Sequence, residues 1–262
     1  MGQSDRMFKS KEFRSKHGAG HTQAPESRQA PEGKHASDSK QPTPTRAQLA
    51  RRIDHSLLRA QATQGEMDQL CDEAVEYGFA TVSVNPVWTA YCAKRLRESS
   101  VGVNPVIGFP LGATTAHIKL EEAQEAVRHG AAELDMVINI GALRSGFPQY
   151  VEQEIAAIVR TAKDVPVKVI LETSYLNDEE KWRVCEIAVR AKAAFVKTST
   201  GFGKSGATAK DVALMREAVG PRFGVKAAGG IRTLRDTLLL LEAGANRIGT
   251  SRGVDILKEL PS

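Results

Sequence analysis

The chain of 262 residues is poor in cysteine and contains no long apolar run. Its three cysteines, Cys71, Cys92 and Cys185, lie far apart and form no CxxC pair, which excludes a disulfide framework and a thiolate metal site. Buried, reduced thiols in the cytoplasm are the simplest interpretation. No stretch approaches the roughly 20 apolar residues of a membrane-spanning helix, and the polar N-terminus is unlike a secretory signal peptide. We therefore expect a cytoplasmic protein without a membrane partner.

The first 48 residues differ in composition from the rest of the chain. They carry nine Lys/Arg against five Asp/Glu, so most of the net charge of +5 lies there. They have too few aliphatic side chains to offset the entropy of ordering, and we predict a disordered basic tail. A basic tail can contact nucleic acid, but these charges are dilute and Phe8 and Phe13 are the only aromatic residues. We favour a solvated extension without a nucleic-acid partner, followed by one folded domain over residues 49–262.

Short apolar runs alternate with amphipathic segments from about residue 49 onward. Eight runs are predicted as strands: Ile53–Leu58, Ala80–Asn85, Asn104–Phe109, Glu133–Asn139, Val167–Glu172, Phe195–Thr200, Gly224–Ala228 and Arg247–Gly249. Six segments between them are predicted as helices: Thr63–Tyr77, Thr114–His129, Tyr150–Lys163, Asp178–Lys192, Ala209–Val219 and Leu234–Ala243. Asn177 and Thr233 precede acidic first turns, as N-caps do. Eight such repeats favour an α/β fold of the TIM (β/α)8 barrel type over an open doubly wound sheet, which usually has fewer strands.

Two lysines occupy matching places on two neighbouring apolar runs. Lys197 and Lys226 are separated by one strand–helix–strand step, so in a barrel their strands are adjacent. Burial and a like charge both lower the pKa of an amine, and a neutral amine can attack a carbonyl to form a Schiff base. The alternative is that both lysines extend along the surface to solvent, which is more usual for a lysine in a strand. The spacing leaves open which lysine would be the nucleophile.

An acidic residue lies within the fourth predicted strand, where Asp135 shares a face with Val137 and Asn139. An acid in an apolar strand is rarely buried without a partner. We interpret Asp135 as a proton-transfer group that pairs with the second lysine, and a structural salt bridge is the alternative. Asp54 and Lys168 form a further candidate buried pair, for which we favour a structural role because both lie early in their strands.

Glycine-rich segments follow the last three predicted strands. Backbone N–H groups at the ends of strands seven and eight, with a helix N-terminus, form the usual phosphate site of a barrel. A tight turn would explain each glycine singly, but such segments on adjacent strands favour phosphate binding. The motifs G-x-G-x-x-G and Walker A are matched only weakly over residues 201–206, because the acid and the glycine that they require elsewhere are missing. The last two of these segments contain Gly229 and Gly230 after strand seven, and Gly249 with Ser251 and Arg252 after strand eight.

Long segments of the chain resemble the 2-deoxy-D-ribose-5-phosphate aldolase family. The resemblance runs in order from about residue 50 to residue 258, and its motifs are highly specific. The motifs are residues 53–58 (IDHSLL), 106–112 (VIGFPLG), 133–139 (ELDMVIN), 197–202 (KTSTGF) and 225–233 (VKAAGGIRT). The resemblance implies a class I aldolase on a TIM barrel. Such an enzyme reversibly cleaves 2-deoxy-D-ribose 5-phosphate to D-glyceraldehyde 3-phosphate and acetaldehyde, in deoxyribonucleoside catabolism.

The same resemblance implies roles for individual residues. Lys197 would be the Schiff-base lysine, Lys226 the neighbouring cation that lowers its pKa, and Asp135 a partner of a water in proton transfer. The resemblance also implies five candidate phosphate-binding residues, at positions where the family binds phosphate: Gly201, Gly229, Gly230, Gly249 and Ser251. No metal and no other cofactor is expected, because the iminium serves as the electrophile. Barrels of this kind often form dimers or tetramers, so a homo-oligomer is expected, with phosphorylated sugar and acetaldehyde as the small-molecule partners.

The chain departs from the family pattern at two places. Ser83 stands where many members carry cysteine, and we hypothesise that its hydroxyl makes the enzyme less sensitive to aldehyde damage. The chain also ends without the tyrosine that assists proton transfer in some members. Two other functions are considered: another Schiff-base aldolase or transaldolase, and a non-catalytic barrel that binds phosphorylated ligands.

Overall fold

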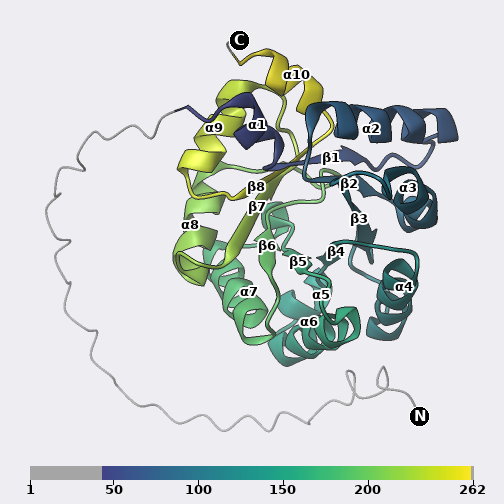
Figure 1. The fold of residues 1–262 in the computed structure, drawn as a ribbon. Helices are drawn as coiled ribbons and strands as arrows, with labels where there is room; N and C mark the ends of the chain where they lie inside the picture. Colours follow the sequence, from purple (N-terminus) through teal and green to yellow (C-terminus); the bar gives the residue numbers. More distant parts are fainter. Residues whose placement is uncertain (1–42, 261–262) are drawn as a thin grey trace, which may run out of the picture. The chain divides into compact units, whose positions relative to one another are not determined.

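The computed structural model describes residues 43–260. Eight parallel strands close into a barrel in sequence order, and β8 pairs with β1 (Figure 1). The closed barrel confirms the predicted TIM fold. The strands are β1 (Ile53–Leu57), β2 (Thr81–Val84), β3 (Gly102–Ile107), β4 (Leu134–Val137), β5 (Val167–Ile170), β6 (Phe195–Lys197), β7 (Gly224–Ala228) and β8 (Arg247–Thr250).

Helices surround the barrel and follow its strands in the chain (Figure 1). The six predicted helices are present with ends shifted by at most a few residues: α2 (Gln64–Tyr77), α4 (Ala116–Arg128), α6 (Pro148–Ala162), α7 (Asp178–Arg190), α8 (Ala209–Val219) and α9 (Leu234–Glu242). The predicted N-caps are also confirmed. Asn177 accepts a hydrogen bond from the Glu180 backbone N–H, and Thr233 accepts one from Asp236.

Several short elements were missing from the prediction. The helix α3 (Thr89–Leu96) connects β2 to β3, and its buried residues Thr89, Cys92 and Leu96 include only one aliphatic side chain. Its apolar pattern is therefore weak in the sequence. The short elements are α1 (Arg46–Ala50), α5 (Ile140–Arg144), α10 (Gly253–Lys258) and the 3-10 turns η2 (Pro86–Trp88) and η3 (Thr173–Tyr175).

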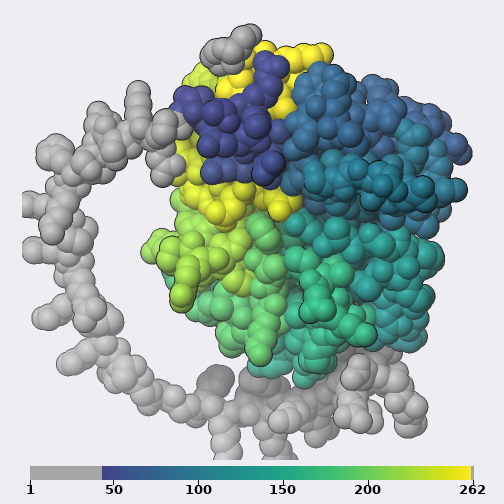
Figure 2. Space-filling model, in the orientation of Figure 1, coloured from purple at the N-terminus to yellow at the C-terminus, as the bar shows by residue number. Residues whose placement is uncertain are grey.

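The predicted boundary between residues 48 and 49 falls inside α1. This helix has a capping box at Thr45, and it packs beside α10, as the space-filling view shows (Figure 2). The Arg46 guanidinium donates a hydrogen bond of 3.4 Å to the Leu260 carbonyl. Residues 1–42 of the predicted tail lie outside the described residues.

The strand register decides which side chains face the barrel interior. Side chains alternate along each strand, so partners in register on neighbouring strands point the same way. Lys197 of β6 is the register partner of Lys226 of β7, and Asp135 of β4 is the partner of Lys168 of β5. Charged residues of β4, β5, β6 and β7 therefore meet inside the barrel.

Candidate active site

Three predicted site residues meet at the centre of the barrel. The Lys197 Nζ lies 2.6 Å from Asp135 Oδ2, and the Lys226 Nζ lies 2.7 Å from the same oxygen. All three side chains are at most 3% exposed. One carboxylate oxygen therefore accepts hydrogen bonds from both amines. The three residues lie on β4, β6 and β7, so this contact depends on how the three strands align in the barrel.

Lys226 has a second carboxylate partner that the sequence analysis did not assign to it. Its Nζ lies 2.5 Å from Asp54 Oδ2, so it sits between two carboxylates. The predicted pair of Asp54 with Lys168 is present, but the two atoms are 3.9 Å apart. Each of these two residues has closer partners, and the pair is one contact within a larger network.

A buried network of six charged residues, here called the ionic cluster, fills the barrel beneath Lys197. Lys168 contacts Asp135 at 3.0 Å and Glu133 at 2.6 Å, while Arg247 contacts Asp54 at 2.6 Å. Three cations thus balance three carboxylates, and adding a charged Lys197 would leave an excess positive charge. The members of the ionic cluster are Asp54, Glu133, Asp135, Lys168, Lys226 and Arg247.

Burial is the largest cause of an altered pKa at Lys197. It lowers the pKa of this amine from 10.5 to about 8; Asp135 opposes the shift, and the positive charges of Lys226 and Lys168 add to it. The sequence analysis named both burial and the charge of Lys226 as causes of a lowered pKa, and in the structure burial is the larger of the two. At neutral pH an appreciable fraction of the Lys197 amine is uncharged.

Asp135 is held in its ionised form. Burial alone would raise the pKa of this carboxyl, but the ammonium groups of Lys168, Lys197 and Lys226 together hold it well below its usual range. The pKa of Asp54 is lowered in the same way, against the effect of burial, with Lys226 as the strongest cation. Both carboxylates therefore act as hydrogen-bond acceptors for the amines throughout the neutral range.

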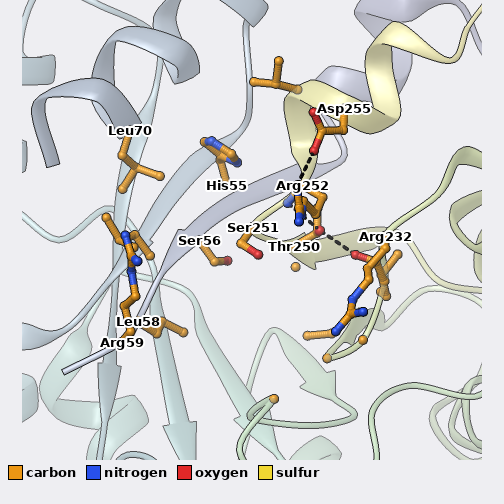
Figure 3. A pocket seen from close by; sticks show the side chains of 18 of the residues that line it. His55, Ser56, Leu58, Arg59, Leu70, Arg232, Thr250, Ser251, Arg252 and Asp255 are labelled. Carbon is orange, nitrogen blue, oxygen red and sulfur yellow. Dashed lines mark hydrogen bonds and ion pairs between the residues drawn. The ribbon is translucent and has the colours of Figure 1, made fainter. Parts of the chain in front are cut away.

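A cavity of about 910 Å³ opens above the ionic cluster. Lys197 lines this cavity, whereas Lys226 and Asp135 are fully buried and are not among the residues that line it. Figure 3 shows Arg59 and Leu70 on one side of the cavity, and Arg232 and Ser251 on the other. Of the two lysines, only Lys197 can be reached by a molecule in the cavity.

The five candidate phosphate-binding residues all line this cavity. They surround it at the ends of β6, β7 and β8, as the sequence predicted, and they are Gly201, Gly229, Gly230, Gly249 and Ser251. Gly201, Gly229 and Gly230 have φ values of 88°, 90° and 76°, which side chains rarely adopt. Gly249 has another reason to lack a side chain, because a Cβ there would lie 2.9 Å from Lys226 Cε.

Some residues of the site were not singled out in the sequence. Arg232 brings a cationic side chain to the cavity close to Gly230, and Figure 3 shows it opposite Arg59. His55 also lines the cavity, and its Nε2 lies 2.7 Å from the Glu73 carboxylate. The position of Arg232, two residues after Gly230 and beyond the predicted seventh strand, was a readable signal. No local pattern indicated the pairing of His55 with Glu73, which lies on α2.

Ser83 is fully buried inside the barrel, beside Asn104 of β3. Its hydroxyl donates to the Asn104 carbonyl at 3.2 Å and accepts from the Asn104 side-chain amide at 3.0 Å. All three cysteines are buried and unpaired, as expected. Within residues 43–260, no group of three or more His, Cys, Asp or Glu side chains is arranged to hold a metal ion, and no helix is long and apolar enough to cross a membrane.

Comparisons with known proteins agree with this geometry. Residues 49–259 match the model of the DeoC/LacD family aldolases. The deoxyribose-phosphate aldolase of Caldanaerobacter subterraneus subsp. tengcongensis is 54% identical over 214 residues, which cover 80% of this chain and 93% of that protein. The corresponding enzyme of Streptococcus equi subsp. zooepidemicus is 55% identical over 206 residues, or 79% of this chain and 94% of that protein. The tetrameric deoxyribose phosphate aldolase of Aeropyrum pernix superimposes with a TM-score of 0.77 at 38% identity, over 82% of this chain and 91% of that chain.

Proposed function

The chain belongs to the DeoC/LacD family of aldolases, and on that premise we propose that it is a class I deoxyribose-phosphate aldolase. It reversibly cleaves 2-deoxy-D-ribose 5-phosphate to D-glyceraldehyde 3-phosphate and acetaldehyde, in deoxyribonucleoside catabolism. One observation carries the proposal: the Lys197 amine, with its pKa lowered to about 8, lines a cavity that is surrounded by glycine-rich loops. An amine that is partly neutral at pH 7 can attack an aldehyde.

Lys197 is the proposed nucleophile, and Lys226 is the proposed neighbouring cation. The assignment rests on two differences between them. Lys197 borders the cavity and contacts one carboxylate, whereas Lys226 is enclosed and contacts both Asp54 and Asp135. The Lys226 ammonium lies between these two carboxylates, and its positive charge helps to lower the pKa of Lys197.

The reaction begins when the Lys197 amine adds to the C1 aldehyde and water leaves, which forms an iminium. The C3 hydroxyl then loses its proton, the C2–C3 bond breaks, and its electron pair flows into the iminium to give an enamine. Glyceraldehyde 3-phosphate is released at this point. Protonation of the enamine carbon and hydrolysis free acetaldehyde and restore the Lys197 amine. The iminium takes the electrons of the broken bond, so no metal or other cofactor is required.

Asp135 is the proposed group for proton transfer, working with a water molecule. Its Oδ2 lies 2.6 Å from Lys197 Nζ, so it also stabilises the positive charge of the iminium. Since Asp135 does not line the cavity and its pKa is held low, a water between it and the substrate is needed to carry the proton. The low pKa makes the protonated carboxyl a strong acid towards the enamine.

The glycine-rich loops at β6, β7 and β8 are the proposed phosphate site. Backbone N–H groups at Gly201, Gly229 and Gly230, together with Ser251, would grip the phosphate while the sugar extends towards Lys197. Arg232 lines the same side of the cavity and adds positive charge. The phosphate is bound away from the reacting carbon. Holding it there positions the aldehyde against the Lys197 amine, which lowers the entropic part of the activation barrier.

A substrate comparison tests this function directly. The purified protein should cleave 2-deoxyribose 5-phosphate with equal release of both aldehydes, and treatment with EDTA should leave the rate unchanged. Faster cleavage of fructose 6-phosphate or ribose 5-phosphate would instead identify a transaldolase or another Schiff-base aldolase. Absence of any cleavage, with phosphosugar binding retained, would identify a non-catalytic binding barrel.

Three further features outside the active site are also proposed. We propose a homo-oligomer, because the related Aeropyrum pernix enzyme is described as tetrameric; sedimentation of the purified protein would show a dimer or a tetramer.

The three unpaired cysteines favour the cytoplasm, which fractionation of the source cells would test. Residues 49–262 form the proposed catalytic domain, so removal of residues 1–42 should leave the aldolase rate unchanged.

A further inference from the structure

Glu172 has the most unusual backbone and side-chain environment near the cavity. It follows β5 with φ 55° and ψ 66°, a left-handed conformation that residues other than glycine seldom adopt. It is only 2% exposed, and its Oε1 has no hydrogen-bond partner among the described residues. Strained conformations of this kind persist where the surroundings hold them, and they are concentrated at functional sites.

The Glu172 carboxylate holds the start of the loop that follows β6. Its Oε2 accepts a hydrogen bond from the Thr200 hydroxyl and another, of 3.2 Å, from the Thr200 backbone N–H. The Thr200 Oγ1 in turn accepts from the Phe202 N–H at 3.0 Å. A single buried carboxylate thus sets the backbone path from Thr200 to Phe202, three consecutive residues that line the cavity.

The same loop folds over the carboxylate. A Cβ at Gly203 would lie 2.7 Å from both Cδ and Oε1 of Glu172, so the loop approaches the carboxylate too closely for any side chain there. The far end of the loop is fixed to β7, because the Ala207 N–H donates to the Gly229 carbonyl at 3.0 Å. Glu172 is therefore the anchor at one end of the loop, and Gly229 is the anchor at the other.

We propose that Glu172 is a positioning residue, whose carboxylate holds the loop of residues 200–206 in the conformation that binds the substrate phosphate. This inference rests on the proposed function, and it assigns the phosphate grip a support from outside the cavity. The hydrogen bonds of its two neighbours account for the positive φ of Glu172. Leu171 and Thr173 continue the pairing with β6 through Lys197 and Thr198, and the left-handed residue between them turns its side chain towards Thr200.

The decisive comparison is between 2-deoxyribose 5-phosphate, which carries a phosphate, and acetaldehyde, which does not. In Glu172→Gln, the side chain keeps its shape but loses its charge, and hydrogen bonds to a charged group are about twice as strong as neutral ones. We expect KM for 2-deoxyribose 5-phosphate to rise about tenfold, and competitive inhibition by inorganic phosphate to weaken equally. The kcat, and the trapping of acetaldehyde on Lys197 by borohydride, should stay within about twofold of the unaltered protein.

A second variant reaches the same contact from the loop. Gly203 does not have a positive φ, so Gly203→Ala adds only a methyl group that pushes against the carboxylate, and it should raise the same KM. The control is Glu179→Gln, since this exposed residue pairs only within its own helix, with Arg183. The inference would be overturned if the trapping of acetaldehyde fell as much as the affinity for 2-deoxyribose 5-phosphate. An unchanged KM in both variants would also overturn it. Failure of the unaltered protein to trap acetaldehyde would instead refute the proposed function.

Discussion

The ionic cluster and the cavity above it use the same kinds of residue for different purposes. Inside the ionic cluster, Lys226 lies between two carboxylates, and every cation is matched by an anion. At the cavity, Lys197 shares one of those carboxylates, Asp135, and has no partner of its own. Two lysines in register on adjacent strands therefore differ in their counter-ions and in their access to the cavity.

Replacing Lys197 tests the cavity side of this comparison and should have the largest effect. Without the amine, no Schiff base forms, and we expect Lys197→Met to reduce kcat/KM by about 10⁴-fold or more, as loss of other covalent nucleophiles does. The exposed Lys210 on α8 offers a control, since Lys210→Met should leave the rate nearly unchanged. Residual activity within about tenfold of the unaltered protein would place the nucleophile elsewhere.

Replacing Lys226 tests the ionic cluster. Lys226→Met leaves Asp54 and Asp135 with less positive charge around them, and breaking a buried pair in this way costs about 3–5 kcal/mol of stability. The variant should also be less active, because the loss of the Lys226 ammonium removes a charge that lowers the pKa of Lys197. Denaturant unfolding measures the first effect, and the pH midpoint of acetaldehyde trapping, which should move upward, measures the second. Lys226→Arg keeps the charge and should lose less stability; equal losses in both variants would argue against a charge effect.

The pH dependence follows from the lowered pKa of Lys197. Below about pH 8 the rate of Schiff-base formation should fall with the neutral fraction of the amine, and above it the rate should level off. The folded protein releases this proton near pH 8 and the unfolded chain near 10.5, so the unfolded chain binds more protons between these values. Stability from this residue therefore rises with pH across that window and is lowest below it. The free energy of unfolding, measured near pH 8 and near pH 10.5, should show a rise from this residue in the unaltered protein that Lys197→Met lacks.

The smallest expected effect concerns Ser83. Its hydroxyl exchanges hydrogen bonds with Asn104 and is less nucleophilic than a thiolate, so it should resist unsaturated aldehydes. Ser83→Cys should leave the aldolase rate nearly unchanged but should be inactivated faster by crotonaldehyde. Equal inactivation rates of the two proteins would refute the protective role.

The sequence predicted the parts of the molecule that depend on repeating patterns. Alternating strands and helices led to the barrel, and the even spacing of Lys197 and Lys226 placed them on adjacent strands. The helix α3 was missed because its buried residues include only Leu96 as an aliphatic side chain. The contact of Lys226 with Asp54 depends on closure of β8 onto β1, which brings together residues far apart in the chain.

The role of Glu172 was unpredictable for a different reason. Its left-handed backbone is not encoded by a glycine, and its contact with Thr200 crosses from β5 to the loop after β6. The relative weight of burial and of the Lys226 charge in the pKa shift at Lys197 could not be predicted either, because the depth of burial of a side chain is known only from the packed structure. The sequence thus predicted the candidate reacting groups, while the structure shows which side chains contact them.

The site of the covalent adduct tests the central claim most directly. The protein is incubated with 2-deoxyribose 5-phosphate, reduced with borohydride, digested and examined by mass spectrometry. The account predicts a covalent adduct on Lys197 alone, with Lys226 unmodified. An adduct on Lys226, or on any other lysine, would contradict the assignment of the neutral amine to the cavity and the charged one to the ionic cluster.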